Sequence, residues 1–232
     1  MISVIIPTFN EAACIKKTVQ ALWNNDIHQC ITEILIADGG SSDATWSEAQ
    51  SEGVTTLLCP VKGRAAQMNY AASSAKGNIL YFLHADTLPP VGFTNHIVNT
   101  LEQGHIAGCF MLAFDHSHWF LEANCWFTRF NFNYFRFGDQ SLFIGKDAFM
   151  KCGGFSEKHI VLEDQEIIHR IKRLGKFSVV KIPVMTSARK YLDNGIFKTQ
   201  GIFYLIYAMY KMRFPQRQLL STYRKLMRQD KL

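Results

Sequence analysis

With 232 residues, the chain is long enough for one large domain or two small ones. Its content of 48% hydrophobic and 19% charged residues is typical of a globular protein and excludes an intrinsically disordered one. The net charge of +6 comes from the end of the chain: residues 195–232 contain eight basic residues and one acidic residue (+7), so the first 194 residues sum to −1. No recognised nucleic-acid-binding motif accompanies this basic segment, so we expect no nucleic-acid partner.

The six cysteines are scattered along the chain and form no CxxC pair, a pattern typical of reduced thiols. Residues 1–3 carry no basic side chain and the first apolar run ends at Pro7, so no secretory signal is indicated. We therefore expect a cytoplasmic protein, either free or held peripherally at the inner face of the membrane.

In the first half of the chain, short apolar runs alternate with helical patterns. Strands are predicted at 2–6, 33–37, 54–58 and 79–83, with helices between them. This alternation is typical of βαβ units and predicts an α/β fold with a mostly parallel sheet. We expect Asn10 to cap the first helix and Glu11 to lie at the positive end of its dipole.

The pattern changes after about residue 90. Helices are predicted at 93–101 and 163–174, and strands at 108–114, 141–144 and 177–182. The first of these strands is expected to be antiparallel. The segment 119–137 is dense in aromatic residues, which we expect to lie mostly in the core, with some lining an acceptor pocket.

Acidic residues follow the predicted strands at Asp38, Asp43 and Asp86. The carboxyl ends of parallel strands meet at one edge of the sheet, where such folds bind ligands. Asp86 comes soon after the apolar run 79–83, and its carboxylate cannot be buried there without a partner. A Mg²⁺ or Mn²⁺ ion shared with substrate phosphates would satisfy it. The alternative is an aspartate that caps the next turn.

Two further segments carry residue types that bind nucleotides. In Asp38-Gly39-Gly40, the carboxylate suits a base N–H or ribose hydroxyls, and the glycines let backbone amides approach a phosphate. Lys62 and Arg64 lie at a predicted helix start, where cations beside free amides form an anion site. The alternatives are a plain glycine turn and a solvated surface pair. Neither GxGxxG nor GxxxxGK[ST] occurs, so neither a dinucleotide fold nor a P-loop is indicated.

Glu163 and Asp164 begin the amphipathic helix predicted at 163–174. Acidic residues are common in the first turn because they stabilise the helix dipole, and this is the alternative to a catalytic role. The functional interpretation is that one of the two carboxylates removes the proton from an attacking hydroxyl group.

Four motifs, in the order in which they occur along the chain, resemble those of family 2 glycosyltransferases. These enzymes have the GT-A fold and invert the configuration of the transferred sugar. The motifs are Val4-Ile5-Ile6-Pro7-Thr8-Phe9-Asn10-Glu11, Asp38-Gly39-Gly40-Ser41-Ser42-Asp43, His84-Ala85-Asp86-Thr87 and Glu163-Asp164. The similarity extends to a bacterial branch through Gly63-Arg64-Ala65-Ala66-Gln67-Met68-Asn69 and Thr186-Ser187-Ala188-Arg189. The fold implied is GT-A-like, a mostly parallel Rossmann-like sheet flanked by helices, with a C-terminal helical extension.

The resemblance implies a nucleotide pocket lined by Pro7, Thr8, Glu11 and Asp38. It also implies that Asp86 ends a DxD-like motif and holds Mg²⁺ or Mn²⁺, and that Asp164, with Glu163 beside it, is the catalytic base. The expected nucleotide-sugar site also includes Asn10, Gly39, Gly40, Arg64, Gln67, Asn69, His84 and Ala85. His84 stands where the family has an acid, which leaves open whether it contacts metal or ribose. Asp139 and Gln140 are expected to contact the acceptor.

We expect a catalytic domain at 1–195, with a nucleotide-sugar half at about 1–90 and an acceptor half at about 91–195, and a basic helical tail at 196–232. The tail is predicted to form two helices separated at Pro215. Its apolar run 201–210 is too short to span a bilayer, but with basic residues on both sides it suits the surface of an anionic membrane. The alternatives are packing on the catalytic domain and contact with a homodimer partner.

The expected function is metal-dependent, inverting transfer of a sugar from a nucleoside-diphosphate sugar to a hydroxyl group of a glycan or lipid-linked acceptor. Two alternatives stay open. One is a non-catalytic module of the same fold that binds a nucleotide sugar or carbohydrate, and the other is a nucleotidyltransferase.

Overall fold

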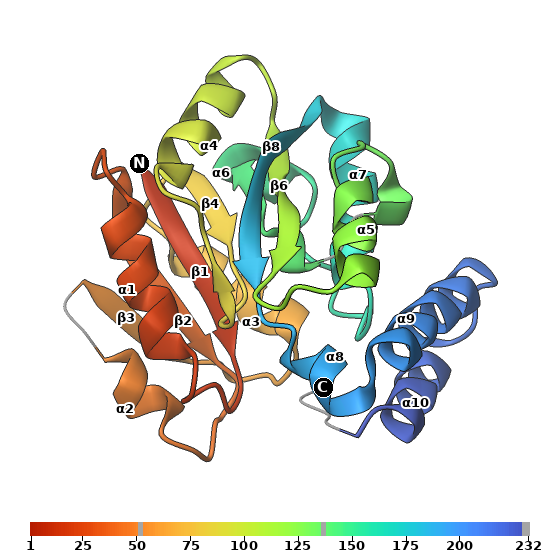
Figure 1. The fold of residues 1–232 in the computed structure, drawn as a ribbon. Helices are drawn as coiled ribbons and strands as arrows, with labels where there is room; N and C mark the ends of the chain where they lie inside the picture. The colour runs from red at the N-terminus through yellow and green to blue at the C-terminus, as the bar shows by residue number, and fades with distance from the viewer. Residues whose placement is uncertain (51–52, 136–137, 229–232) are drawn as a thin grey trace.

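The computed structural model describes residues 1–50, 53–135 and 138–228 (Figure 1). In these ranges the strands are β1 (Ile2–Thr8), β2 (Ile31–Asp38), β3 (Val54–Leu58), β4 (Ile79–Phe82), β5 (Thr87–Leu88), β6 (Ala107–Phe114), β7 (Leu142–Gly145) and β8 (Phe177–Thr186). The α-helices are α1 (Ile15–Asn25), α2 (Thr45–Ala49), α3 (Arg64–Ser74), α4 (Phe93–Glu102), α5 (Trp119–Phe127), α6 (Lys146–Lys151), α7 (Glu163–Leu174), α8 (Arg189–Asn194), α9 (Ile196–Lys211) and α10 (Gln216–Leu226). Two short 3₁₀ helices are η1 (Asn133–Phe135) and η2 (Gly138–Gln140).

The described strands form one sheet in the order β3-β2-β1-β4-β7-β6-β8-β5. The first four strands in this order are mutually parallel, so β1, β2 and β4 end at the same edge. In the second half, β7 runs antiparallel to both β4 and β6, whereas β8 runs parallel to β6. The predicted mostly parallel α/β sheet is confirmed. The strand expected to be antiparallel has one antiparallel and one parallel neighbour.

Helices cover both faces of the sheet because its central strands are apolar on both sides. All four residues of β4 are buried, as expected for a strand between two packed layers. One core lies under α1 and α4, and its members include Ile15, Leu22 and Phe93. The other lies under α3, α6 and α7, and its members include Met68 and Ile171. Figure 1 shows α1 in front of the red strands and α3 behind them.

The predicted cap of the first helix is wrong. The helix begins at Ile15, and its N-cap residue is Cys14. Asn10 instead has a φ of 55°, and its Oδ1 accepts a hydrogen bond from the Ser42 backbone N–H at 2.9 Å. Asparagine tolerates this left-handed conformation and bonds readily to nearby backbone groups, so it stabilises the loop instead of the helix.

The prediction that the aromatic segment is mostly core is wrong for its described side chains. Six of them are between 37% and 66% exposed: Trp119, Trp126, Phe127, Phe130, Phe132 and Tyr134. For the three on α5, the reason is that the helix directs Leu121 and Cys125 toward the core, which leaves Trp119, Trp126 and Phe127 facing outward. The side chain of Phe135 and all of Phe137 lie outside the described residues.

The tail forms two helices, α9 and α10, and Pro215 lies directly before α10, as predicted. The two helices pack together through Ile202, Ile206, Leu219 and Tyr223, against a segment around Val161. Packing on the rest of the chain therefore accounts for one face of the tail. Residues 229–232 of the predicted tail lie outside the described part. Across the described residues, every helix falls short of the length and apolar character that crossing a bilayer requires.

The aromatic centre of the core gives a test of the packing. Phe110 is fully buried between Tyr81 and Phe143, with ring centroids 6.1 and 5.7 Å away. We expect Phe110→Ala to lower the free energy of unfolding by about 3–5 kcal/mol, because it leaves a cavity. Leu58→Ala, at a position that is 62% exposed on β3, is the matched control and should change it by less than about 0.5 kcal/mol. Equal urea midpoints for the two variants would contradict this packing.

Candidate active site

The loop after β2 is organised by the carboxylate of Asp38, which is buried at the end of that strand. Its Oδ1 accepts hydrogen bonds from the backbone N–H groups of Gly40 at 2.7 Å and Ser41 at 2.8 Å. Its Oδ2 accepts from the hydroxyl groups of Ser41 at 2.6 Å and Thr8 at 3.2 Å. Gly40 has a φ of +86°, which favours glycine at this position. Asp38 therefore fixes the shape of the loop from inside.

A second loop, between β1 and α1, lies against the first. The Asn10 backbone N–H donates to Ser41 Oγ at 2.9 Å, and the Glu11 backbone N–H donates to Thr45 Oγ1 at 2.7 Å. Pro7 and Thr8, the last residues of β1, pair with the end of β2. The residues predicted to line the nucleotide pocket are thus brought together at the parallel edge of the sheet.

Gln67 is buried beneath these loops. Its Nε2 donates to the carbonyl oxygens of Thr8 at 2.8 Å and Ala37 at 2.7 Å. A Cβ atom added at Gly39 would lie 3.1 Å from this Nε2, so the loop passes close to the amide. These contacts within the fold occupy the Gln67 side chain, and its predicted contact with the nucleotide stays a prediction.

An ion pair joins the starts of two helices that lie far apart in the sequence. Arg64, at the start of α3, places its Nη1 3.2 Å from Oε1 of Glu163, at the start of α7. The Glu163 side chain is only 4% exposed, so the ion pair provides a buried carboxylate with a partner of opposite charge. Sequence reasoning assigned Arg64 to the nucleotide sugar and Glu163 to catalysis, and the structure brings the two into direct contact.

Asp164 follows directly on α7, and its Oδ1 accepts a hydrogen bond from the Gln165 backbone N–H at 2.8 Å. Burial raises the pKa of Asp164 to about 7, and the neighbouring Glu163 carboxylate adds to this rise. A carboxylate whose pKa lies near neutrality is suited to accept a proton and to release it again.

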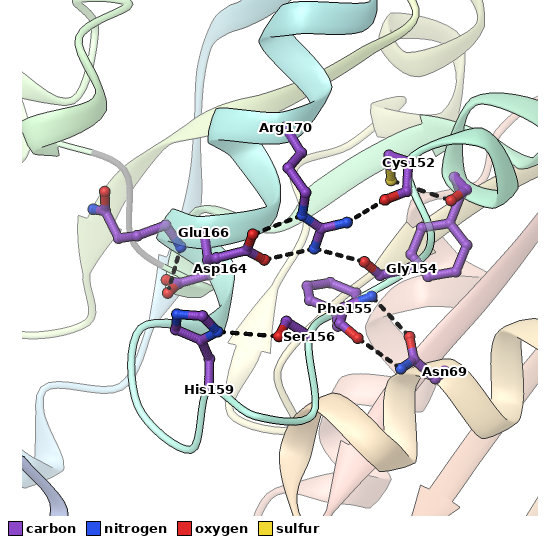
Figure 2. A network of polar contacts seen from close by, with 11 residues as sticks. Asn69, Cys152, Gly154, Phe155, Ser156, His159, Asp164, Glu166 and Arg170 are labelled. Atoms are coloured by element: carbon purple, nitrogen blue, oxygen red, sulfur yellow. Dashed lines mark hydrogen bonds and ion pairs between the residues drawn. The ribbon is translucent and has the colours of Figure 1, made fainter. Parts of the chain in front are cut away.

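A network of polar contacts holds the start of α7 in place (Figure 2). Arg170 bonds to both carboxylate oxygens of Glu166, at 2.7 and 2.5 Å, and to the carbonyl oxygen of Gly154 at 2.8 Å. Asn69 of α3 binds the backbone of Phe155, accepting from its N–H at 2.8 Å and donating to its carbonyl at 2.9 Å. The predicted site residue Asn69 thus ties α3 to the segment that precedes α7, and its contact with the nucleotide stays a prediction.

His84 and Asp139 come from opposite halves of the chain and form a close pair. His84 Nδ1 lies 2.7 Å from Asp139 Oδ1. Burial alone would raise the pKa of Asp139, but the hydrogen bond and charge of His84, with Lys190 and Arg64 nearby, hold it below its ordinary value. Asp139 therefore supplies a negative charge next to the position where the family motif has an acid.

The Asp86 carboxylate lies in a partly buried group of acids. Burial raises its pKa, and the carboxylates of Asp139 and Glu11 add to the rise, whereas His84 and Lys190 oppose it. A divalent cation would relieve this repulsion, so the residues fit the predicted metal. Within the described residues, no group of three or more His, Cys, Asp or Glu side chains is arranged to hold a metal alone. Asp86 would therefore share the ion with substrate phosphates and water.

Arg189 completes the site and was given no role by sequence reasoning. It begins α8, directly after β8, and its Nη2 lies 3.6 Å from Oε2 of Glu11. It is also close enough to Asp86 for their charges to interact. Its position just past the end of a strand is the signal that could have identified it, since the same rule identified Asp86.

A cavity of about 30 Å³ lies below this edge of the sheet. Its polar wall consists of Arg64, His84, Ser141, Glu163 and Asp164. The volume is enough for water but far below the roughly 300–1,000 Å³ of small-molecule sites. A sugar ring is therefore too large to fit inside this cavity.

Two predicted site residues are buried beside this edge. The carbonyl oxygen of Ala85 accepts a hydrogen bond from Thr18 Oγ1 at 2.6 Å. Gln140 is 1% exposed, and its Oε1 accepts from Cys109 Sγ at 3.6 Å. Both side chains lie beneath the surface, and their predicted ligand contacts stay predictions.

Solved structures with this fold include two proteins that contain a bound nucleotide or nucleotide sugar. Mannosyltransferase PcManGT from Pyrobaculum calidifontis, in complex with GDP-Man and Mn²⁺, has a TM-score of 0.69 and 20% identity, over 97% of this chain and 69% of that chain. Residues 1–349 of S. aureus TarS, in complex with UDP, have a TM-score of 0.66 and 16% identity, over 80% of this chain and 60% of that chain. At these identities the likeness shows the fold, and it confirms the predicted GT-A-like architecture.

Sequence comparisons agree. Glycosyltransferase AglE from Haloferax volcanii is 30% identical over 106 residues, which are 43% of this chain and 35% of AglE, so the match spans about a third of that relative. The model of glycosyl transferase family 2 matches residues 3–157, more than half of the chain. The resemblance inferred from the motifs is confirmed: the chain belongs to glycosyl transferase family 2.

Proposed function

We propose that this protein transfers a sugar from a nucleoside-diphosphate sugar to an acceptor hydroxyl group, with inversion at the anomeric carbon. The observation that carries the proposal is Asp164, whose pKa of about 7 suits a general base and which lies on the same cavity as His84. Asp86 lies close to the His84–Asp139 pair at the parallel edge of the sheet. The relatives support the donor class, because PcManGT was solved with GDP-Man and TarS with UDP-GlcNAc.

In the proposed reaction, the acceptor oxygen forms a bond to the anomeric carbon as the bond from that carbon to the diphosphate oxygen breaks. Asp164 Oδ1 is engaged by the Gln165 backbone N–H, so Oδ2 takes the proton of the attacking hydroxyl. Arg189 and Lys190 stabilise the negative charge of the departing nucleoside diphosphate. Asp86 would hold Mg²⁺ or Mn²⁺, and the ion would supply further positive charge to stabilise the departing diphosphate.

Each half of the proposed catalytic domain contributes different residues to the reaction. The donor half, at about 1–90, supplies the Asp38 loop and Asp86, while Asp139 and Asp164 come from the acceptor half, at about 91–195. We propose that Asp139 borders the acceptor, a hydroxyl group of a glycan or a lipid-linked sugar, while the side chain of Gln140 is buried next to it in the chain. The boundary at residue 195 and these roles rest on the same resemblance as the donor site.

The base is tested by Asp164→Asn, which keeps the size of the side chain but cannot accept the proton. We expect transfer to fall by about 10²–10⁴-fold, with unchanged far-UV circular dichroism and donor binding. Asp147→Asn, an exposed acid on α6, is the matched control and should retain full activity. The assay measures the released nucleoside diphosphate and the anomeric configuration of the product. Release of pyrophosphate would indicate a nucleotidyltransferase, and donor binding without any release would indicate a non-catalytic module.

The raised pKa of Asp164 also predicts how stability depends on pH. Between its usual value of 3.8 and the folded-state value of about 7, the folded protein keeps a proton on Asp164 that the unfolded chain has lost. The contribution of Asp164 to stability is therefore fully present below the lower value and is lost as the pH rises toward 7. Thermal melting of Asp164→Asn across this range should show a smaller decline than the unmodified protein. Parallel curves for the two proteins would contradict the raised pKa.

The metal is tested through binding rather than turnover. We expect Mn²⁺ to increase the thermal shift produced by a nucleotide sugar in the unmodified protein, because the ion and the diphosphate bind together. Asp86→Asn should abolish this increase while leaving the shift produced by a nucleoside alone. An increase of equal size in the variant would remove Asp86 from the proposed metal site.

A further inference from the structure

The outer side of α5 and α9 exposes an unusual number of large apolar side chains, which together we name the aromatic surface. Its members from α5 and the segment after it are Trp119, Trp126, Phe127, Phe130, Phe132 and Tyr134, and those from α9 are Phe197, Tyr204 and Leu205. Each is at least 37% exposed. Large exposed apolar patches on soluble domains mark interaction sites.

Contacts between the two segments make this one surface. The rings of Trp119 and Phe197 lie 6.2 Å apart at one end. In the middle, the hydroxyl of Tyr204 donates to Asn124 Oδ1 at 2.7 Å. The ring of Tyr134 lies 5.8 Å from that of Tyr207, which is also on α9. The aromatic side chains are thus held in place, so little side-chain entropy would be lost on binding.

Basic side chains lie among these rings. The guanidinium of Arg129 lies 4.6 Å from the centre of the Trp126 ring, and Lys211 Nζ lies 5.3 Å from the Tyr134 ring. Lys198 and Arg213 are exposed nearby on or just after α9. Over residues 116–134 and 196–213 the sequence contains a single acidic residue, Glu122. The aromatic surface is therefore both apolar and positively charged.

The geometry points to an anionic lipid bilayer as the partner, and we propose that the aromatic surface docks this protein on one. Tryptophan and tyrosine favour the membrane interface, and each basic residue near it adds attraction to anionic headgroups. A second copy of the chain fits less well, because two positively charged surfaces would repel each other.

The membrane contact predicted from the sequence involved the tail alone. The proposed contact involves α9 of the tail together with α5 and the segment after it. The inner face of the α9–α10 pair is already occupied, since Ile202 and Leu219 pack in one cluster with Val161. The outward residues of α9 contribute to the aromatic surface, and α5 contributes the rest. Figure 1 places α9 beside α8, which carries Arg189 of the site. Docking would therefore bring the catalytic edge close to the lipid surface, a property that goes beyond sugar transfer itself.

The test is flotation of the full chain with vesicles, without any donor, so that its outcome does not depend on transfer. We expect binding to vesicles of phosphatidylcholine mixed with phosphatidylglycerol, weaker binding to phosphatidylcholine alone, and a decrease with added salt. Phosphatidylglycerol lipids with brominated chains should quench tryptophan fluorescence in proportion to the bound fraction.

Two variants locate the contact. The double variant Trp119→Ser/Trp126→Ser should bind at least about tenfold more weakly, because two large apolar side chains no longer enter the interface. Trp46→Ser, at a 39% exposed tryptophan on α2, is the matched control and should bind like the unmodified protein. Far-UV circular dichroism and urea unfolding verify that all variants are folded.

Three results would overturn the proposal. They are a failure to float with anionic vesicles, equal flotation of the folded double variant, and equal binding to neutral and anionic vesicles. Sedimentation without lipid adds a fourth: a dimer that the double variant abolishes would show that a second copy covers this surface.

Discussion

The site depends on one ion pair, between Arg64 and Glu163. The Glu163 carboxylate is almost fully buried, and an uncompensated charge there would strongly oppose folding. Arg64 provides the compensation from the other half of the chain, so α3 and α7 must start side by side. Because Asp164 is the next residue along α7, this contact also sets the position of the proposed base.

From that pair, acidic and basic groups continue along the edge of the sheet. Next to Asp164 comes His84, then Asp139 and Asp86, and finally Glu11 with Arg189. The surroundings drive the carboxyl pKa values apart, since Asp164 and Asp86 are raised and Asp139 is lowered. Such separation lets neighbouring acids hold different protonation states at one pH, which acid–base chemistry requires.

Much of the fold could be predicted from the sequence because its strands are short apolar runs with clear ends. The strand predicted at 54–58 and the helix predicted at 163–174 coincide with β3 and α7. The acids at the ends of parallel strands were also found this way, because the topology of the sheet brings them together. The strands and the helix are local signals that depend on residues close in the sequence, and the parallel topology inferred from them places the acids at one edge.

Contacts between distant segments could not be predicted in this way. Nothing near His84 indicates that Asp139 will approach it, since the contact depends on the antiparallel pairing of β4 with β7, the strand that follows η2. The outward direction of the aromatic residues on α5 was missed for a related reason. Hydrophobicity predicts burial, but it does not tell which face of a helix finds a packing partner. On α5, the buried face consists of Leu121 and Cys125, and the tryptophan and phenylalanine rings lie on the other faces.

The His84–Asp139 contact also has a consequence for which residues the two positions can hold. A chain with an acid at position 84 would place two carboxylates at hydrogen-bond distance, so it would favour a neutral or basic residue at position 139. Conversely, losing the imidazole first would leave Asp139 without its partner at 2.7 Å, while the Asp86 carboxylate still lies close enough to repel it. Substitutions should therefore appear at both positions together, and the order in which they arise is constrained. In an alignment of close relatives, this would appear as covariation between a strand end and a short 3₁₀ helix.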